Sequence, residues 1–275
     1  MQVNGTTRLP TVITLAQQKG GVGKTTTAAY LGVGLAERGK NCLMLDLASS
    51  GNLTSALGFI PESIKLTTSD LFQGIKSPGE LVKSTAIAGL KLIPANASLS
   101  ATHRSLYQQP DYELVLRSIL SQPFFSEFDF LILDCPPGLD SININAIASA
   151  DLAILPVVCD FFSLQTLSNM FRLINVARQR ANPDLSYRIV INKLNTKWPL
   201  QEQIFAQIKS HYKTAILKTF INENGSIPES QIKGSPLLND KPESQLARQF
   251  RALTNEILSL DNLNQKIRPM KKVKP

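Results

Sequence analysis

Long apolar runs, a secretory leader and cysteines with metal-ligand spacing are all missing from this 275-residue sequence. No run approaches the roughly 20 consecutive apolar residues that a bilayer-spanning helix needs, so we expect no integral membrane association. The polar stretch Asn4–Arg8 leaves the first ten residues without the apolar centre of a secretory signal, which favours a cytoplasmic protein. The three cysteines, Cys42, Cys135 and Cys159, lie within or beside apolar runs, as expected for small core residues rather than metal ligands.

Acidic residues are absent from the last ten positions of the chain. The sequence has 29 lysines and arginines against 21 aspartates and glutamates, a net charge of +8, and the final ten residues are especially basic. An excess of positive charge favours a polyanionic partner. We predict a short N-terminal tail at 1–10, a single domain at 11–262, and a basic, disordered tail at 263–275.

Short apolar runs with little alternation are present throughout the domain, and helical patterns separate them. Runs of this kind are typical of strands that are covered on both faces of a parallel sheet. They predict an α/β fold, a doubly wound, mostly parallel sheet with helices on both faces, whose ligand binds at the carboxyl ends of the strands. The predicted strands are Thr11–Ala16, Cys42–Asp46, Leu90–Pro94, Phe130–Asp134, Leu152–Val157 and Arg188–Asn192. The predicted helices follow the first strand up to Gly39, follow Pro110, and span Phe162–Arg180 and Glu243–Leu260.

The residues after the first apolar run have the composition of a phosphate-binding loop. Such a loop needs glycines that turn backbone N–H groups toward an anion, a lysine for the β- and γ-phosphates, and a hydroxyl for Mg²⁺. The strict pattern G-x-x-x-x-G-K-[ST] fails here, because Gln18 occupies its first glycine position and a second lysine, Lys19, follows. The predicted nucleotide-binding residues in this loop are Gly20, Gly21, Val22, Gly23, Lys24, Thr25 and Thr26.

Two acidic residues end apolar strands. Asp134 ends the run Phe130–Asp134, which is the Walker B arrangement, where a carboxylate holds Mg²⁺ through water. Asp46 ends the second strand. We predict that Thr25, Asp134 and Asp46 form the metal site.

The segment Lys19–Thr26, which reads KGGVGKTT, resembles the deviant Walker box of the ParA/MinD family of ATPases. The segment Asp134–Pro137, followed by Ile144–Ala146, is similar to the same family, and the resemblance extends from about 11 to 260, weakest at 59–122. It implies a P-loop ATPase with ATP and Mg²⁺ as cofactors. It also implies a homodimer in the ATP state, in which Lys19 reaches the nucleotide of the partner subunit.

One catalytic position departs from the family pattern Asp-x-Asp-Pro-Gln-Gly-Asn. Asp46 matches the first acid, but the second, which orients the attacking water in relatives, is Ala48. A methyl group neither accepts a proton nor holds a water, so we expect ATP binding with impaired hydrolysis. Two origins stay open: a natural member with unusual chemistry, or an Asp→Ala change made to trap ATP. Asp46 faces the same side of its strand, and whether it substitutes for the missing acid also stays open.

The segment Asn192–Asn195 is a near-match to the guanine-recognition motif Asn-Lys-x-Asp. Its last residue is an amide, which is a poorer partner than a carboxylate for the two guanine donors, so adenine is favoured. The family resemblance implies that Asn192 faces the adenine edge and that the stretch after Pro228 packs over the base.

The resemblance implies a ParA-type ATPase that binds nonspecific DNA and is nucleoid-associated. Such an ATPase positions a plasmid, a chromosome or a protein assembly such as a carboxysome, and a cargo-bound adaptor stimulates its hydrolysis. Ser226 stands where many DNA-binding relatives carry an arginine. The basic residues proposed to contact DNA are Lys218, Lys233, Lys241, Arg248 and Arg251.

Two other functions occur on the same fold. A MinD-like membrane-associated ATPase needs a terminal amphipathic helix, which Leu258, Leu260, Leu263 and Ile267 would supply in part, but Pro269 separates them from the last lysines. An iron–sulfur reductase needs cysteines shared across a dimer, whereas the three cysteines here belong to apparent strands.

Overall fold

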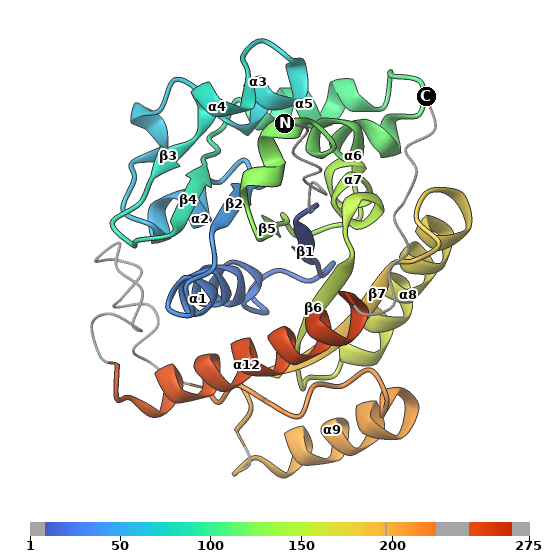
Figure 1. Cartoon of the computed structure of the whole chain (residues 1–275). Coiled ribbons are helices and arrows are strands. Elements are labelled where there is room, and N and C mark those ends of the chain that lie inside the picture. Colours follow the sequence, from blue (N-terminus) through green and yellow to red (C-terminus); the bar gives the residue numbers. More distant parts are fainter. Residues whose placement is uncertain (1–8, 196, 224–241, 266–275) are drawn as a thin grey trace.

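A seven-stranded sheet forms the centre of the protein (Figure 1). The computed structural model describes residues 9–195, 197–223 and 242–265, with side chains up to residue 260. The strand order is β3-β4-β2-β5-β1-β6-β7, and every neighbouring pair is parallel except β3 with β4. The predicted mostly parallel sheet is therefore confirmed. The strands are β1 (Thr11–Leu15), β2 (Cys42–Asp46), β3 (Lys83–Ser84), β4 (Leu90–Ile93), β5 (Phe130–Asp134), β6 (Leu152–Val158) and β7 (Ser186–Asn192).

Helices cover both faces of the sheet, as the doubly wound prediction requires. Successive strand residues point to opposite faces, so Ile13 belongs to the core cluster that includes α1 and α12, whereas Val12 belongs to the cluster that includes α3, α5, α6, α7 and α8. Both faces are buried, which is why the strands are uniformly apolar. The helices are α1 (Lys24–Ala36), α2 (Asn52–Ala56), α3 (Thr68–Gln73), α4 (Pro78–Leu81), α5 (Leu99–Leu106), α6 (Val115–Leu120), α7 (Ser141–Ser149), α8 (Ser163–Arg180), α9 (Pro199–Tyr212) and α12 (Gln245–Gln265).

Local signals account for several helix ends. Gly39, at φ +70°, closes the turn after α1, as predicted. Asp140 caps α7 by accepting a hydrogen bond from the Asn143 N–H, and Pro199 occupies the first turn of α9, although the sequence reading placed no helix at either α7 or α9. The two-residue strand β3 is too short to leave a pattern. Among the described helices, none combines the length and apolarity needed to cross a bilayer.

The terminal helix α12 packs closely along α1, and Figure 1 shows the two side by side. Tyr30 of α1 stacks on Phe250 of α12 with ring centroids 4.3 Å apart. Gly34 makes this approach possible, because a Cβ added there would lie 2.3 Å from the Thr254 hydroxyl oxygen. That hydroxyl donates to the Phe250 carbonyl at 2.9 Å and is therefore held in place.

We predict that Gly34→Ala lowers the free energy of unfolding by about 1–3 kcal/mol, because the added methyl group overpacks the contact between α1 and α12. Thr254→Ala removes the clashing hydroxyl, so Gly34→Ala should cost less than half as much in that background. Urea unfolding of the two single variants and the double variant measures the coupling. Strictly additive effects would contradict this account of the contact.

Candidate nucleotide-binding site

The predicted site residues gather at the carboxyl edge of the sheet. β1 lies between β5 and β6, so the order in which strands are added to the parallel sheet reverses at this point, and a crevice at such a point is where α/β sheets bind ligands. The loop after β1 leads directly into α1, with Gly23 as the N-cap in the left-handed conformation, at φ +92°. The first N–H groups of a 13-residue helix are thereby directed toward the loop.

Long-range hydrogen bonds hold the phosphate loop in shape. Asn192, at the end of β7, donates from Nδ2 to the Val22 carbonyl at 2.7 Å. A Cβ at Gly23 would lie 2.1 Å from that same Nδ2, so both space and backbone angle require glycine. The Gly138 N–H donates to the Gln18 carbonyl at 3.0 Å, which ties the loop after β5 to the phosphate loop. The shape of the phosphate loop is therefore held by hydrogen bonds from other parts of the fold.

Asn192 has a second role that the sequence reading did not predict. Its side-chain amide is buried and committed to the phosphate loop, so Asn192 positions Val22 and Gly23. The contact of Asn192 with adenine stays a prediction. Pro228, which was expected to lie near the base, falls outside the described residues.

The two lysines of the loop have different surroundings. Lys24 is buried, and its Nζ donates to the Lys19 carbonyl at 3.0 Å. Burial lowers the pKa of Lys24, and the nearby Asp134 carboxylate offsets part of that change. Lys19 is partly exposed at the edge of the loop, where its ammonium forms an ion pair with Asp160 in the turn after β6. Lys24 thus points into the site, and Lys19 lies on its outer rim.

Two carboxylates lie side by side beneath the loop. Asp46 of β2 and Asp134 of β5 are in register in adjacent parallel strands, and both are fully buried. Burial raises the pKa of Asp134 to about 8, and the neighbouring Asp46 carboxylate adds to the rise. Neither carboxylate oxygen of Asp134 has a hydrogen-bond partner among the described residues, although the Thr25 hydroxyl and Lys24 lie close enough to lower the pKa in part.

Asp46 differs from Asp134 because its oxygens are already occupied. One oxygen accepts from the Ala48 N–H at 3.1 Å, and the other accepts from the Thr54 N–H at 2.9 Å and the Thr54 hydroxyl at 2.7 Å. These bonds shape the loop from Ala48 to Thr54. Asp46 therefore organises this loop. Whether it also takes part in the metal site or orients a water stays a prediction. Ala48 itself is buried.

The residues present fit a bound Mg²⁺. The buried Asp134 carboxylate and the Thr25 hydroxyl beside it are the hard oxygen donors that Mg²⁺ takes in nucleotide sites, where phosphates and waters complete the shell. An uncompensated buried carboxylate is otherwise costly, so a cation at this point relieves the burial penalty.

Comparison with known sequences identifies the family of this chain. The AAA domain family matches residues 10–187 of the chain. The chromosome partitioning protein ParA of Myxococcus xanthus is 30% identical over 251 residues, which cover 91% of this chain and 88% of that protein. The chain belongs to the ParA family of ATPases.

Solved structures agree with the ParA family fold. Cobyrinic acid a,c-diamide synthase from Mycobacterium smegmatis, with bound ADP and magnesium, superposes with a TM-score of 0.81 at 25% identity and covers 97% of this chain and 100% of that one. The ATP complex of an aspartate-to-alanine variant of Cyanothece McdA has a TM-score of 0.81 at 23% identity, with 90% and 96% covered. This second likeness shows the fold alone.

Sequence reasoning missed the residues that support the ParA-type loop from other elements. Asp160 pairs with Lys19, and Asn169 of α8 donates to the Gln18 side chain at 2.9 Å. A further contact that the sequence did not predict joins His103 of α5 to the loop after β5: its Nδ1 lies 3.9 Å from the Asp140 carboxylate, and burial lowers the pKa of His103. Of these residues, only Asp160 could have been predicted from the sequence, because it is an acidic residue that directly follows an apolar strand, and ligands bind at the carboxyl ends of such strands.

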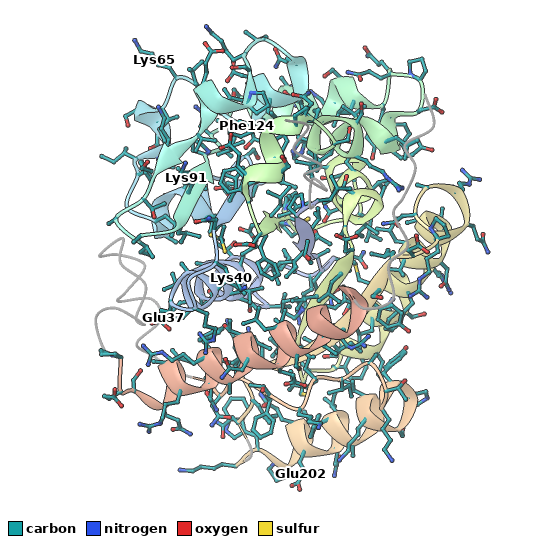
Figure 2. All side chains as sticks on the ribbon, viewed as in Figure 1. Glu37, Lys40, Lys65, Lys91, Phe124 and Glu202 are labelled. Atoms are coloured by element: carbon teal, nitrogen blue, oxygen red, sulfur yellow. The ribbon has the colours of Figure 1, made fainter. Side chains whose placement is uncertain are left out.

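The residues proposed for DNA contact lie in different settings. Lys218 and Arg248 are exposed. Arg251 instead forms a two-pronged ion pair with Glu37, the C-cap residue of α1, at 3.0 and 2.9 Å, and Figure 2 labels Glu37. Lys233 and Lys241, like Ser226, fall outside the described residues. Whether any of these residues contacts DNA stays a prediction.

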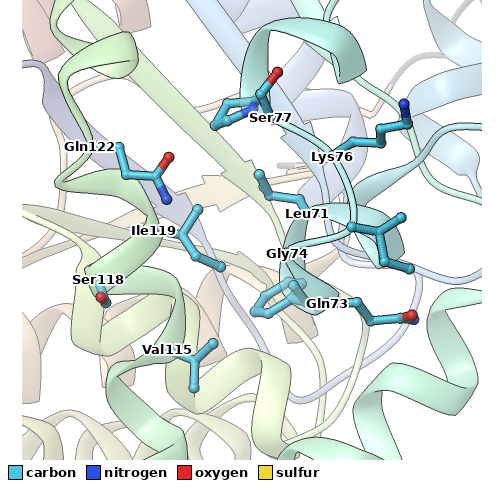
Figure 3. A pocket seen from close by; sticks show the side chains of 12 residues that line it. Leu71, Gln73, Gly74, Lys76, Ser77, Val115, Ser118, Ile119 and Gln122 are labelled. Carbon is cyan, nitrogen blue, oxygen red and sulfur yellow. The ribbon is translucent and has the colours of Figure 1, made fainter.

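A separate hollow of about 570 Å³ lies between the α3–α4 segment and α6. Figure 3 shows Leu71 of α3 and Ile119 of α6 facing each other across it. The predicted nucleotide-binding residues that the structure describes are not among those that line this hollow.

We predict that Asp134→Asn stabilises the ligand-free protein at high pH. In the unfolded chain this carboxyl loses its proton near pH 4, whereas in the folded protein it keeps the proton up to about pH 8. The folded state binds more protons between these values, so its stability falls as the pH rises through this window. The variant escapes that loss and should melt at least ~2 °C higher than the parent at pH 8.

Thermal melts in EDTA between pH 5 and pH 9 test this expectation. The advantage of Asp134→Asn should grow up to about pH 8 and then level off, because the parent carboxyl is ionised above that point. Glu62→Gln, at an exposed position, is the matched control and should show no such growth. A pH-independent difference for Asp134→Asn would contradict the prediction.

Proposed function

We propose that this protein is a ParA-type ATPase that binds ATP with Mg²⁺, dimerises in that state, and then binds nonspecific DNA to position an intracellular cargo. Lys19 carries this proposal. It stands at the outer rim of a preformed phosphate loop, and Asp160 holds its ammonium at the partly exposed edge of the site. A lysine at this rim would be within reach of a second subunit that docks on this edge, and there it would contact the partner's nucleotide.

Each loop residue has a defined part in nucleotide binding. Lys24 and the N–H groups at the start of α1 would contact the phosphates, and Thr25 and Asp134 would hold the Mg²⁺. The metal neutralises phosphate charge when it is bound. The ADP and magnesium present in the Mycobacterium smegmatis relative support this assignment. The near-match at Asn192–Asn195 favours adenine as the base.

Ala48 sets the expected rate of hydrolysis. The Ala48 N–H is held by Asp46, so a side chain at this position is fixed close to the strand ends where Asp134 lies. An aspartate there would be positioned to orient a water, and alanine is not. The aspartate-to-alanine variant of Cyanothece McdA, obtained as an ATP complex, supports the view that such a change retains ATP.

We predict that Ala48→Asp raises kcat for ATP hydrolysis at least ~10-fold, because it restores a group that accepts a proton from the attacking water. ATP affinity should change little, since the phosphate loop is untouched. Phosphate release under saturating Mg-ATP measures the rate. Ala48→Asn has nearly the same shape without the basic carboxylate and is the matched control. Equal rates for the parent and Ala48→Asp would contradict the role assigned to this position.

DNA is the partner that the charge of the protein favours. The net charge of +8 and the exposed Lys218 and Arg248 provide positive surface, and pairing two subunits would double it. Contacts to phosphates carry little sequence preference and release counterions, so affinity falls steeply with salt. Hydrolysis stimulated by a cargo-bound adaptor would release the protein from nucleoid DNA and so create a gradient that moves the cargo.

We predict that the protein binds a random-sequence DNA duplex tightly with Mg-ATP and weakly with Mg-ADP or without nucleotide. Fluorescence anisotropy across a salt series measures this binding. Arg248→Ala should weaken binding by about 3- to 10-fold and reduce the salt slope, as expected for one lost phosphate contact.

The matched control is Arg104→Ala, which removes the same charge from an exposed position on α5, on the other face of the sheet. It should leave DNA affinity nearly unchanged. DNA binding that is indifferent to nucleotide would contradict the proposed switch.

A further inference from the structure

His103 lies on α5, between the loops that follow β2 and β5. Its Nδ1 atom is 3.9 Å from the Oδ2 atom of Asp140, in the loop after β5. The Leu47 backbone, in the loop after β2, lies close enough to the imidazole to raise the pKa of His103. The His103 side chain is 15% exposed, so most of the ring is withdrawn from solvent. One partly buried side chain therefore contacts both loops.

The contact with the loop after β5 is reinforced by the backbone of α5. The Ser141 hydroxyl, in the first turn of α7, donates to the His103 carbonyl at 2.8 Å. Asp140 uses its oxygen Oδ1 to accept from the Asn143 N–H at 3.2 Å and from the Asn143 side-chain amide at 3.0 Å. The other oxygen, Oδ2, faces the imidazole. The start of α7 is thereby connected to His103 at two points.

The contact with the loop after β2 is made at the residue that joins the two strand ends. The Leu47 N–H donates to the Asp134 carbonyl at 3.0 Å, and Leu47 is fully buried. Ala48 follows directly, and its N–H donates to the Asp46 carboxylate at 3.1 Å. A shift of Leu47 would therefore change the position of Ala48 relative to Asp134.

The helix α5 is held in place by residues other than His103. Leu99 and Leu106 are fully buried in the core. The hydroxyls of Thr102 on α5 and Ser69 on α3 form a hydrogen bond at 2.8 Å. A side chain that only filled the space at position 103 would not have to be polar, and burying a polar ring is costly unless its partners compensate.

We propose that His103 is a positioning residue that couples the loop after β2 to the loop after β5, so that the side chain at position 48 and the Asp134 carboxylate keep fixed places relative to each other at the nucleotide. This inference rests on the proposed function, in which position 48 orients the attacking water. Since Ala48 has no group to orient a water, the coupling affects hydrolysis chiefly when an acid occupies that position.

The first test is a double-mutant cycle on ATP hydrolysis. In the Ala48→Asp background, His103→Leu should lower kcat at least ~5-fold, because leucine fills the space but makes no polar contact with either loop. In the parent background, the same change should lower kcat less than ~2-fold, because there is no carboxylate to be positioned. KM for ATP should change less than ~2-fold in both backgrounds, since the phosphate loop is untouched.

A second variant separates positioning from packing. His103→Gln keeps a polar group beside the two loops, so it should recover at least about half of the kcat that His103→Leu loses. If His103→Leu retains the full rate in the Ala48→Asp background, the ring only fills space and the inference is overturned. His211→Leu, on α9, is the matched control, because the His211 ring contacts the Gln207 carbonyl of its own helix, at 2.9 Å, and its loss should leave kcat unchanged.

The second test does not depend on hydrolysis. The chain has two histidines, so its proton NMR spectrum contains two imidazole Hε1 signals, which His103→Gln assigns. Asp140→Asn retains a side-chain oxygen that can cap α7 but removes the charge that raises the pKa of His103. The His103 signal of this variant should titrate at a lower pH than in the parent, and the His211 signal should not change. An unchanged His103 titration would overturn the contact on which the coupling depends.

Nucleotide binding adds a further arm to this NMR experiment. The Gly138 N–H connects the loop after β5 to the phosphate loop, so a nonhydrolysable ATP analogue with Mg²⁺ should shift the His103 signal. The His211 signal is the internal control. If the analogue binds and the His103 signal stays in place, the imidazole does not follow the loops of the site, and the inference is overturned.

The failure of this inference and the failure of the proposed function give different results. If Ala48→Asp hydrolyses ATP faster than the parent, and His103→Leu lowers kcat by the same factor in both backgrounds, His103 does not act through position 48, and the proposed function stands. If Ala48→Asp is no faster than the parent, the role assigned to position 48 and the inference built on it are both overturned.

Discussion

The parallel pairing of β2 with β5 places Asp46 and Asp134 next to each other in the interior, and the site is built around that constraint. Two like charges in a medium of low dielectric constant are not both ionised without compensation. Asp46 is compensated by three hydrogen bonds from Ala48 and Thr54, whereas the burial of Asp134 is offset only in part, by the Thr25 hydroxyl and Lys24. Asp134 of the ligand-free protein therefore has a raised pKa. A cation bound beside the Thr25 hydroxyl would offset the free-energy cost of burying its negative charge.

The phosphate loop is held by the whole sheet edge rather than by its own sequence. Asn192 reaches it from β7, Gly138 from the loop after β5, and Asn169 from α8. A loop that is restrained from three directions does not have to be ordered by its ligand, so less entropy is lost on binding. The same restraint explains why Gly23 has no room for a side chain.

The turn after β6 contacts a residue of the phosphate loop that is distant in the sequence. Asp160 uses one carboxylate oxygen to hold Lys19 and the other to shape the turn, by accepting from the Phe162 N–H and the Ser163 hydroxyl. One acidic residue thus connects the rim of the nucleotide site to the start of α8. Arg251 of α12 has a different role: it pairs with Glu37, the C-cap residue of α1, and so joins the two helices at the surface.

The sequence by itself determined every strand except β3, because strands buried on both faces are uniformly apolar, and it determined the phosphate loop, because Gly23, Lys24 and Thr25 act within one short segment. Asp134 was also readable, since an acid at the end of an apolar strand is a local feature. Only the tertiary structure decided the contact between Lys19 and Asp160, which are 141 positions apart, and the commitment of Asn192 to Val22. Those contacts exist because β6 and β7 lie beyond β1 in the sheet, and strand order is set by packing over the whole chain rather than by any local pattern.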